Sequence, residues 1–175
     1  MYPDNDKMRK LSLFAIAFSV FLTTKAQNTF DAIDEYGIIK RNWAIVSQDN
    51  CVGIINKDGD LILSPIYDYI DEFGIFTRDL ALVSYNNKLG FINRKGEIVT
   101  PPTFDEIDEF GVLRSGWALV KNNGKYGFVN KYGNVCVDPK YDFIEEFGIV
   151  SNRFSVVQIK GKYTMINKRG IEIQH

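Results

Sequence analysis

The stretch GKYGFVNKYGNVCVDPKYDFIEEFG, residues 124–148, decides the fold of this chain because it recurs upstream in the same order. NKLGFINRKGEIVTPPTFDEIDEFG covers residues 87–111, and NCVGIINKDGDLILSPIYDYIDEFG covers residues 50–74, so the spacing is 37 residues in both steps. The whole chain after residue 27 divides into four frames of this length, residues 28–64, 65–101, 102–138 and 139–175. Such a period is typical of stacked repeats that bury their apolar faces against one another.

Each frame contains two turn signals. The first is a two-residue pair such as Asn123-Gly124, which suits the positive φ angles of a type I′ turn. The second is Asn-Lys/Arg-x-Gly, as in residues 130–133, which predicts a type I turn followed by glycine in the left-handed region. Two hairpins make a three-stranded antiparallel meander, with strands expected at residues 117–121, 125–130 and 134–138 and at matching positions in the other frames.

The predicted strands are apolar on both faces, which indicates that each meander lies between its neighbours with sheets about 10 Å apart. Gly53, Gly90 and Gly127 lack a side chain in the middle of a strand, so we expect an aromatic residue of the neighbouring unit to approach them closely. The fourth frame has Thr164 at this position, which suggests that the last unit lacks that neighbour and acts as a cap.

The segment that follows each meander reads P-x-[YF]-D-x-I-[DE]-E-[FY]-G, as in residues 139–148. Proline is expected to end the third strand, because it cannot donate to the ladder. The apolar spacing of three then fits a tight connector of one or two helical turns closed by Gly148, or else a short irregular strand.

The expected fold class is therefore all-β: a tandem array of four 37-residue three-stranded antiparallel meanders that form an open curved solenoid. A closed, propeller-like ring of four units is the alternative. The open form is favoured because 37 residues is short for a four-stranded blade of about 40–45. Contact between the first and last units would show the ring.

Residues 1–26 resemble a removable export signal. Met8-Arg9-Lys10 supplies a basic start, residues 11–22 are apolar, and Thr24 and Ala26 are small residues at the positions that a signal peptidase reads. A helix of the 12 apolar residues would span about 18 Å, against about 30 Å of hydrocarbon, so a retained anchor is disfavoured. We expect cleavage after residue 26 and a secreted or periplasmic protein.

The net charge of the exported chain limits the classes of partner that it is expected to bind. Removing residues 1–26 takes away four of 21 basic and two of 22 acidic residues, which leaves a net charge of −3. A mildly acidic chain without a basic cluster is not expected to bind nucleic acid or an anionic membrane. Membrane contact is expected only through the cleaved signal peptide.

Residues 116–144, GWALVKNNGKYGFVNKYGNVCVDPKYDFI, resemble the WG (KWG) β-repeat found in many bacterial proteins. The likeness rests on Ala118 and Val120, on residues 125–128, and on Pro139 with residues 141–142 (Tyr-Asp). It extends over residues 28–175. The tryptophan that gives the family its name is absent from all four copies, where its position is taken by Val52, Leu89, Tyr126 and Tyr163. The resemblance implies a β-repeat architecture, a binding or scaffolding role and no catalytic residues.

The residues that most enzymes need are scarce. The single histidine is His175, the last residue, and there is no glycine-rich phosphate loop and no hydrolase motif. We expect no enzyme, no cofactor, and no catalytic, cofactor-binding or metal-binding residues. Cys51 and Cys136 fall in the first and third frames, at a strand start and a core position, so a disulfide between them is not expected.

Acidic residues cluster once per frame, at residues 31–35, 68–72, 105–109 and 142–146. Calcium could use such a stripe, but the spacing matches no calcium loop, and turn capping and solubility explain it more simply. Aromatic residues at repeated positions are expected in the core. The surface candidates for binding a partner are the non-repeated aromatics and two acids, namely Tyr69, Phe76, Tyr85, Tyr132, Glu106 and Glu109.

From these observations we expect an exported, non-catalytic module that binds or scaffolds a protein or another cell-envelope component. The alternative is a carbohydrate or small-ligand binder that uses exposed aromatics.

Overall fold

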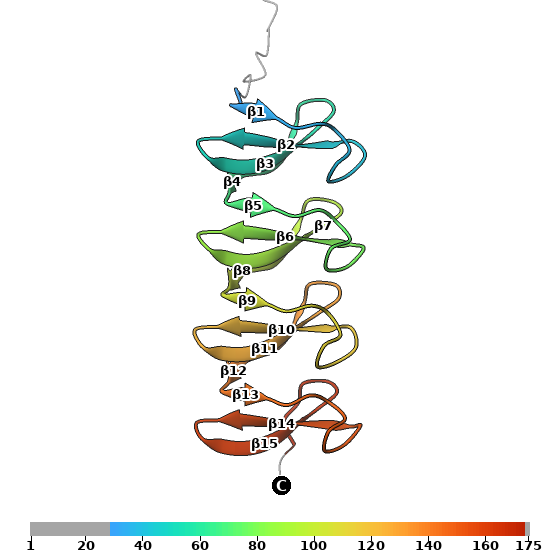
Figure 1. Ribbon diagram of the computed structural model, residues 1–175, viewed down its shortest axis with the longest axis vertical. Coiled ribbons are helices and arrows are strands. Elements are labelled where there is room, and N and C mark those ends of the chain that lie inside the picture. Colours follow the sequence, from blue (N-terminus) through green and yellow to red (C-terminus); the bar gives the residue numbers. More distant parts are fainter. Residues whose placement is uncertain (1–28, 174–175) are drawn as a thin grey trace, which may run out of the picture.

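The computed structural model describes residues 29–173, in which four small antiparallel sheets are stacked along one long axis (Figure 1). The strands of the first two sheets are β1 (Ala32–Ile33), β2 (Trp43–Gln48), β3 (Cys51–Asn56), β4 (Leu61–Tyr67), β5 (Tyr69–Ile70), β6 (Leu80–Tyr85), β7 (Lys88–Asn93) and β8 (Ile98–Phe104). Those of the last two are β9 (Glu106–Ile107), β10 (Trp117–Asn122), β11 (Lys125–Asn130), β12 (Val135–Tyr141), β13 (Phe143–Ile144), β14 (Phe154–Ile159) and β15 (Lys162–Asn167).

Both turn types are confirmed in all four units, and the predicted three-stranded meander is confirmed in the first three; in the described part of the fourth unit the third strand of the meander is missing. The first long strands begin at Trp43, Leu80, Trp117 and Phe154, which keeps the 37-residue period. All four two-residue turns have positive φ at both positions, including Lys160, where φ is 50°. In the second turn the asparagine side chain accepts main-chain N–H bonds from two and four residues ahead, and the glycine has positive φ in every unit.

The expectation that proline ends the third strand is wrong. In the first unit β4 continues through Pro65 to Tyr67, where it pairs with Val52. Leu63 pairs with Ile54, so three residues of β4 bulge outward opposite the single residue Gly53. Proline is tolerated because it lies in this bulge, where no ladder hydrogen bond is required of it.

The repeated strand glycines face their own unit rather than a neighbour's aromatic ring, which corrects the sequence-based interpretation. A Cβ at Gly127 would lie 2.3 Å from the carbonyl oxygen of Val137 and 2.7 Å from the nitrogen of Pro139. The bulged strand therefore crosses so close that only glycine fits. In the described part of the fourth sheet, which has the order β13-β14-β15, no long strand follows β15, and Thr164 fits there.

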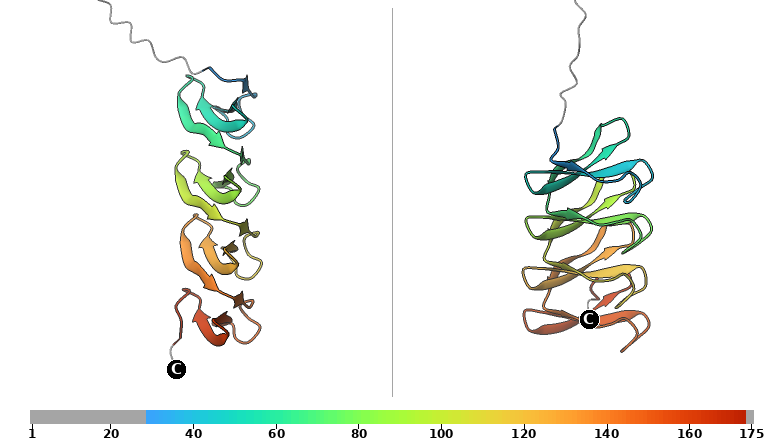
Figure 2. Two further views of the ribbon diagram at one scale, coloured as in Figure 1. Left: turned by 90° about the vertical axis from the view of Figure 1, so that its left-hand side faces the viewer. Right: turned by 45° about the horizontal axis from the view of Figure 1, so that its top comes forward.

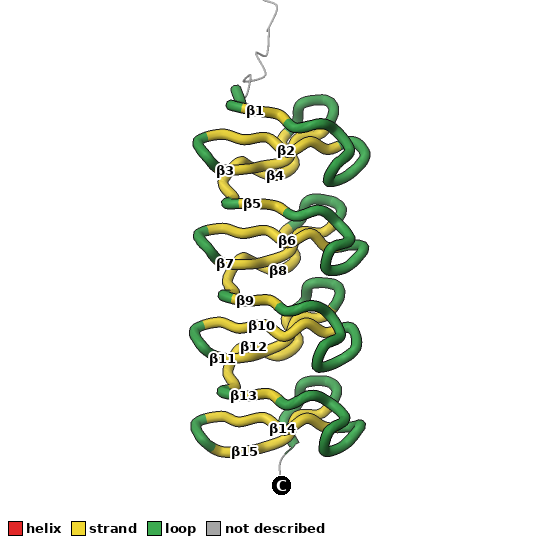
Figure 3. The backbone as a smooth tube through the Cα atoms, in the orientation of Figure 1, coloured by secondary structure: helices red, strands yellow, loops and turns green. Residues whose placement is uncertain are grey.

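The connector after the third strand is a short strand and a loop, not a helical turn. Strands β1, β5, β9 and β13 pair with the edges of β2, β6, β10 and β14, which gives four strands in each of the first three sheets and three in the fourth. Figure 3 shows the strand and the loop that follows it in every unit. None of the segments between residues 29 and 173 forms a helix capable of spanning a bilayer.

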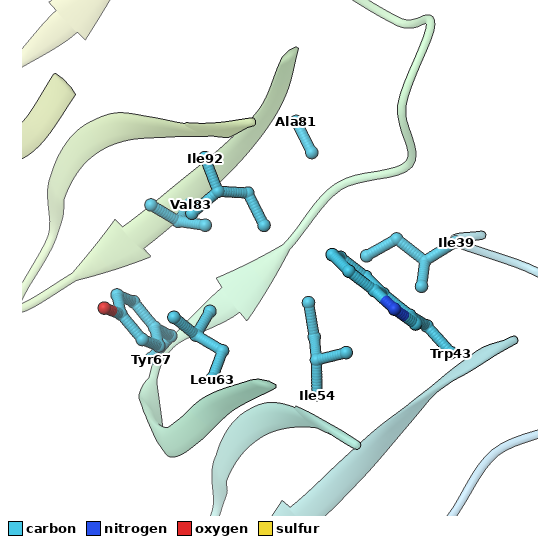
Figure 4. Packing of buried hydrophobic residues seen from close by; sticks show 8 residues of the cluster. All are labelled: Ile39, Trp43, Ile54, Leu63, Tyr67, Ala81, Val83 and Ile92. Atoms are coloured by element: carbon cyan, nitrogen blue, oxygen red, sulfur yellow. The ribbon is translucent and has the colours of Figure 1, made fainter. Parts of the chain in front are cut away.

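The core lies at the junctions between units, as the apolar strand faces predicted. At the first junction Trp43, Ile54 and Leu63 of the first sheet meet Val83 and Ile92 of the second (Figure 4). The second and third junctions are built in the same way. An internal sheet is thus buried on both faces, and burial of about 25 cal/mol per Å² of apolar surface holds the units together.

The array is open. The first and fourth units lie at opposite ends of the stack in both views of Figure 2, so the ring alternative does not apply. Residues 1–26, the predicted export signal, lie outside the described residues.

Candidate functional site

The aromatic candidates of the second unit lie in different surroundings. Tyr69 in β5 and Tyr85 at the end of β6 are exposed, and the ring of Tyr85 meets that of Tyr67 edge-on with centroids 6.2 Å apart. Phe76 is half-buried, and its ring lies 5.6 Å from that of Phe91 within the second junction. Phe76 therefore packs with the core rather than presenting a free surface.

The other candidates lie in the third unit. Glu106 in β9 accepts a 2.8 Å hydrogen bond from Lys121, which raises the pKa of that lysine. Glu109 is exposed in the loop after β9. Tyr132 is exposed in the turn between β11 and β12, which lies at the other end of the sheet from Glu106. The structure does not gather the six predicted residues into one site.

The first acid of each predicted cluster has a structural role at one edge of the stack. This hairpin edge consists of the two-residue turns at residues 49–50, 86–87, 123–124 and 160–161, on the left of Figure 1. The carboxylate accepts a hydrogen bond from a turn N–H of the same unit, over 2.9, 2.9, 2.6 and 2.7 Å for Asp31, Asp68, Asp105 and Asp142. These acids stabilise turns that would otherwise leave a donor unpaired.

Lysines of the hairpin edge join neighbouring units. Lys88 forms an ion pair with Asp105 of the next unit, and Lys125 does the same with Asp142. The lysine hydrogen bond is the main reason why the pKa values of both carboxyls lie below their usual range. Cys51 stands at the corresponding position of the first unit, and both Cys51 and Cys136 are free thiols.

The later acids of each cluster lie beyond the short strands. Burial raises the pKa of Asp71, and the charge of Glu72 adds to the shift. Within residues 29–173, no three His, Cys, Asp or Glu side chains come together in a way that could hold a metal ion.

The opposite edge of the stack is formed by four nine-residue loops, at residues 34–42, 71–79, 108–116 and 145–153. We call it the loop edge; it lies on the right of Figure 1. Main-chain bonds hold each loop at both ends. In the first unit Asp34 N–H donates to the carbonyl of Ile45 over 3.0 Å, and Trp43 N–H donates to that of Lys40 over 2.8 Å. The loops thus present their side chains in a fixed and repeated arrangement.

One position of the loop edge is apolar and exposed in every unit. Its exposed fractions are 53%, 62%, 54% and 64% for Ile38, Ile75, Val112 and Ile149, which we call the apolar column. Each member follows a glycine of positive φ and precedes the bond that closes the loop. Burial does not explain an apolar residue here, and the position repeats once in every unit of the stack.

Sequence reasoning missed the apolar column because it assigned repeated apolar residues to the core. The available signal was the dipeptide Gly-Ile or Gly-Val at the same position of all four frames. Periodicity cannot tell a repeated core residue from a repeated surface residue. The distinction depends on which side of the loop faces the neighbouring unit, and only the folded chain shows that.

Comparison with known proteins agrees with the repeat architecture. The profile of the family described as "WG containing repeat" matches residues 53–88, 90–126 and 126–163, well over half of the chain. A search of curated proteins found no match. The period, the two hairpin turns and the strand glycine recur across the matched region. The chain therefore belongs to the WG-repeat family of β proteins.

Proposed function

We propose that this protein is an exported, non-catalytic β-repeat module that binds a protein partner along its loop edge. The observation that carries the proposal is the apolar column, which places four exposed aliphatic side chains at equivalent points of four stacked units. Each side chain that a partner covers would contribute roughly 1 kcal/mol or more from burial. A partner with its own apolar strip along the stack would gain from all four at once.

The non-catalytic assignment is supported by what the repeated polar residues do. The capping aspartates and the lysines of the hairpin edge are used in turns and ion pairs. A catalytic pair needs an asymmetric, desolvated environment, whereas these groups repeat from unit to unit at the surface. The net charge of −3 after removal of residues 1–26 favours a protein partner over nucleic acid.

The test compares the apolar column with another set of exposed aliphatic residues that repeats from unit to unit. The column variant carries I38S, I75S, V112S and I149S, and the control variant carries L61S, I98S and V135S at the starts of β4, β8 and β12. Partners are captured by crosslinking in the native cell envelope and then measured by direct binding to the purified proteins. We expect at least tenfold weaker binding for the column variant only. Equal binding by both variants would refute the proposal.

Export is tested separately by the N-terminus of the protein recovered from culture fluid or periplasm. We expect the chain to begin at Gln27, after the basic and apolar segments. Recovery of the protein only in the cytoplasm, with residues 8–26 still attached, would contradict this part of the proposal.

A carbohydrate-binding function is the second candidate, because Tyr69, Tyr85 and Tyr132 expose rings on which a sugar could stack. Tyr69 and Tyr85 lie on paired strands of the second unit, whereas Tyr132 lies in a turn of the third, which supports contacts at single sites rather than one extended sugar-binding surface. A glycan array separates the two functions. Binding that is lost in Y132A and kept in the column variant would favour carbohydrate.

A further inference from the structure

A groove of about 440 Å³ lies on the loop edge between the third and fourth units. The side chains that line it include Val112, Arg114, Ser115, Glu146, Asn152 and Lys168. Its walls come from the loops at residues 108–116 and 145–153 and from the turn after β15. Both units thus contribute to the groove, which exists only because they are stacked.

The guanidinium of Arg114 is fixed at this groove but lacks a full set of partners. It lies over the ring of Trp117, 3.5 Å from the centroid, and 5.5 Å from the centroid of Phe147. Its Nη1 is buried without a hydrogen-bond partner in the described structure. Burial lowers the pKa of Arg114, which agrees with a cation that is partly removed from water.

The first junction shows how such cations are satisfied elsewhere in the same chain. Lys40, the counterpart of Arg114, lies over Trp43 and donates a 2.6 Å hydrogen bond to the carbonyl of Arg94. Arg94 in turn donates to the carbonyl of Arg78 over 2.9 and 2.5 Å and lies 3.3 Å from a carboxylate oxygen of Asp79. Protein oxygens thus act as acceptors for both cations.

The third junction lacks the counterpart of the Asp79 carboxylate and has a second cation in its place. The residues at the positions of Arg94 and Asp79 are Lys168 and Arg153. No ion pair joins Glu146 to Arg114 or Lys168 in the described residues, although Glu146 lines the groove. An adjoining hollow of about 280 Å³ shares Lys168 and adds Arg153 and Arg169. Positive charge therefore exceeds negative charge around the groove.

We propose that the groove between the third and fourth units binds an oxyanion, a carboxylate or phosphate group, between Arg114 and Lys168. A guanidinium held close to an aromatic ring keeps N–H donors that suit such a group. The ammonium of Lys168 supplies a second charge, and Asn152 and Ser115 add polar groups at the rim. The second junction has Thr77 in place of Arg114, so the site is specific to the third. This inference goes beyond the proposed partner surface and does not depend on it.

The test is a titration of the ¹⁵N-labelled protein followed by NMR, with acetate, inorganic phosphate or a short glutamate-containing peptide as the probe. Sodium chloride at matched ionic strength gives the baseline. We expect saturable shifts of the Arg114 Nε–H and of the Ser115 and Asn152 amides with at least one probe. The probe that binds most tightly identifies the group as carboxylate or phosphate, and preference for the peptide over acetate points to a side chain of a partner.

Three variants complete the test. R114Q and K168Q should each weaken binding at least tenfold, whereas K131Q, which alters the equivalent lysine of the second junction, should leave it unchanged. Lys168 is exposed, so K168Q tests the site even if R114Q disturbs the packing on Trp117. Failure of all three probes to give saturable shifts, or binding by K168Q equal to that of the unaltered protein, would overturn the proposal.

Discussion

Gly59 in the first unit and Gly133 in the third close the same turn but have different surroundings. Their φ angles are +78° and +85°, and each N–H donates to the carbonyl of the asparagine three residues earlier, over 3.1 and 2.8 Å. A Cβ at Gly59 would meet nothing within 4 Å, whereas one at Gly133 would lie 2.5 Å from Cγ2 of Val99 in the preceding unit. The first unit requires glycine because of the positive φ angle. The third requires it for the same reason and also because a Cβ would overlap the preceding unit.

Other repeated positions show the same difference between an end and the interior. Ile33 in β1 is 54% exposed, whereas its counterpart Ile144 in β13 is 6% exposed at the third junction. Thr164 occupies the position of Gly127, since the described part of the last unit has no bulged strand to cross it. A residue kept in all four units can therefore serve local conformation, contact between units, or both. The ends separate these roles.

The largest expected effect comes from placing threonine, which the last unit has at residue 164, at the equivalent position of the third unit. Gly127→Thr would drive a side chain into the main chain of residues 137–139, so we expect a loss of about 3 kcal/mol or more in the free energy of unfolding. The reverse change at the end, Thr164→Gly, should cost about 1 kcal/mol or less. Chemical denaturation measures both. Similar losses would show that the bulged strand does not explain the glycine.

The next effect compares the two isoleucines of the short strands. Ile144→Ala removes a buried side chain from the third junction and should cost about 3 kcal/mol. Ile33→Ala acts at the exposed end and should cost less than about 1 kcal/mol. The same denaturation measurement applies. An equal cost at both positions would mean that the junction contributes little beyond the strand itself.

A smaller difference is expected for the turn glycines. Gly59→Ala should cost about 1 kcal/mol, because alanine resists positive φ. Gly133→Ala should cost about 1–2 kcal/mol more, because its methyl group also overlaps Val99. Thermal midpoints of the two variants would show the gap. Equal midpoints of the two variants would indicate that Val99 moves aside without a loss of stability.

The smallest effect concerns the lysine bridges of the hairpin edge. The Lys125 hydrogen bond holds the pKa of Asp142 below its ordinary value, so the stability it contributes is present above pH about 4 and lost as the pH falls through the lowered pKa. Asp142→Asn keeps an acceptor for the turn but removes the charge. The midpoint difference from the unaltered protein should be largest near neutral pH and vanish in strong acid.

A control for this prediction comes from the first unit. Asp31 makes the same turn bond, and within residues 29–173 no lysine forms an ion pair with it. High salt should therefore reduce the effect of Asp142→Asn and leave that of Asp31→Asn nearly unchanged, because salt screens exposed ion pairs. Equal salt dependence would show that the bridge between units has no measurable role.

The sequence by itself determined the repeat, its turns and its stacking. Asn123-Gly124 and residues 130–133 specify hairpins through positive φ, which is a property of neighbouring residues. The alternation of Trp117, Ala118 and the residues after them puts apolar groups on both strand faces, and a sheet of that kind must be covered on both sides. Composition and period were enough for these conclusions because they depend on short-range conformation and on total apolar surface.

Only the tertiary structure decided which groups meet. It showed that the main chain of residues 137–139 crosses Gly127, that β12 passes through Pro139, and that Ile149 faces outward while Ile144, five residues earlier, is buried. It also left Arg114 without the acceptor that its counterpart Lys40 has. These outcomes depend on the path of the backbone between distant segments, because a bulge or a loop redirects side chains in ways that a residue pattern does not encode.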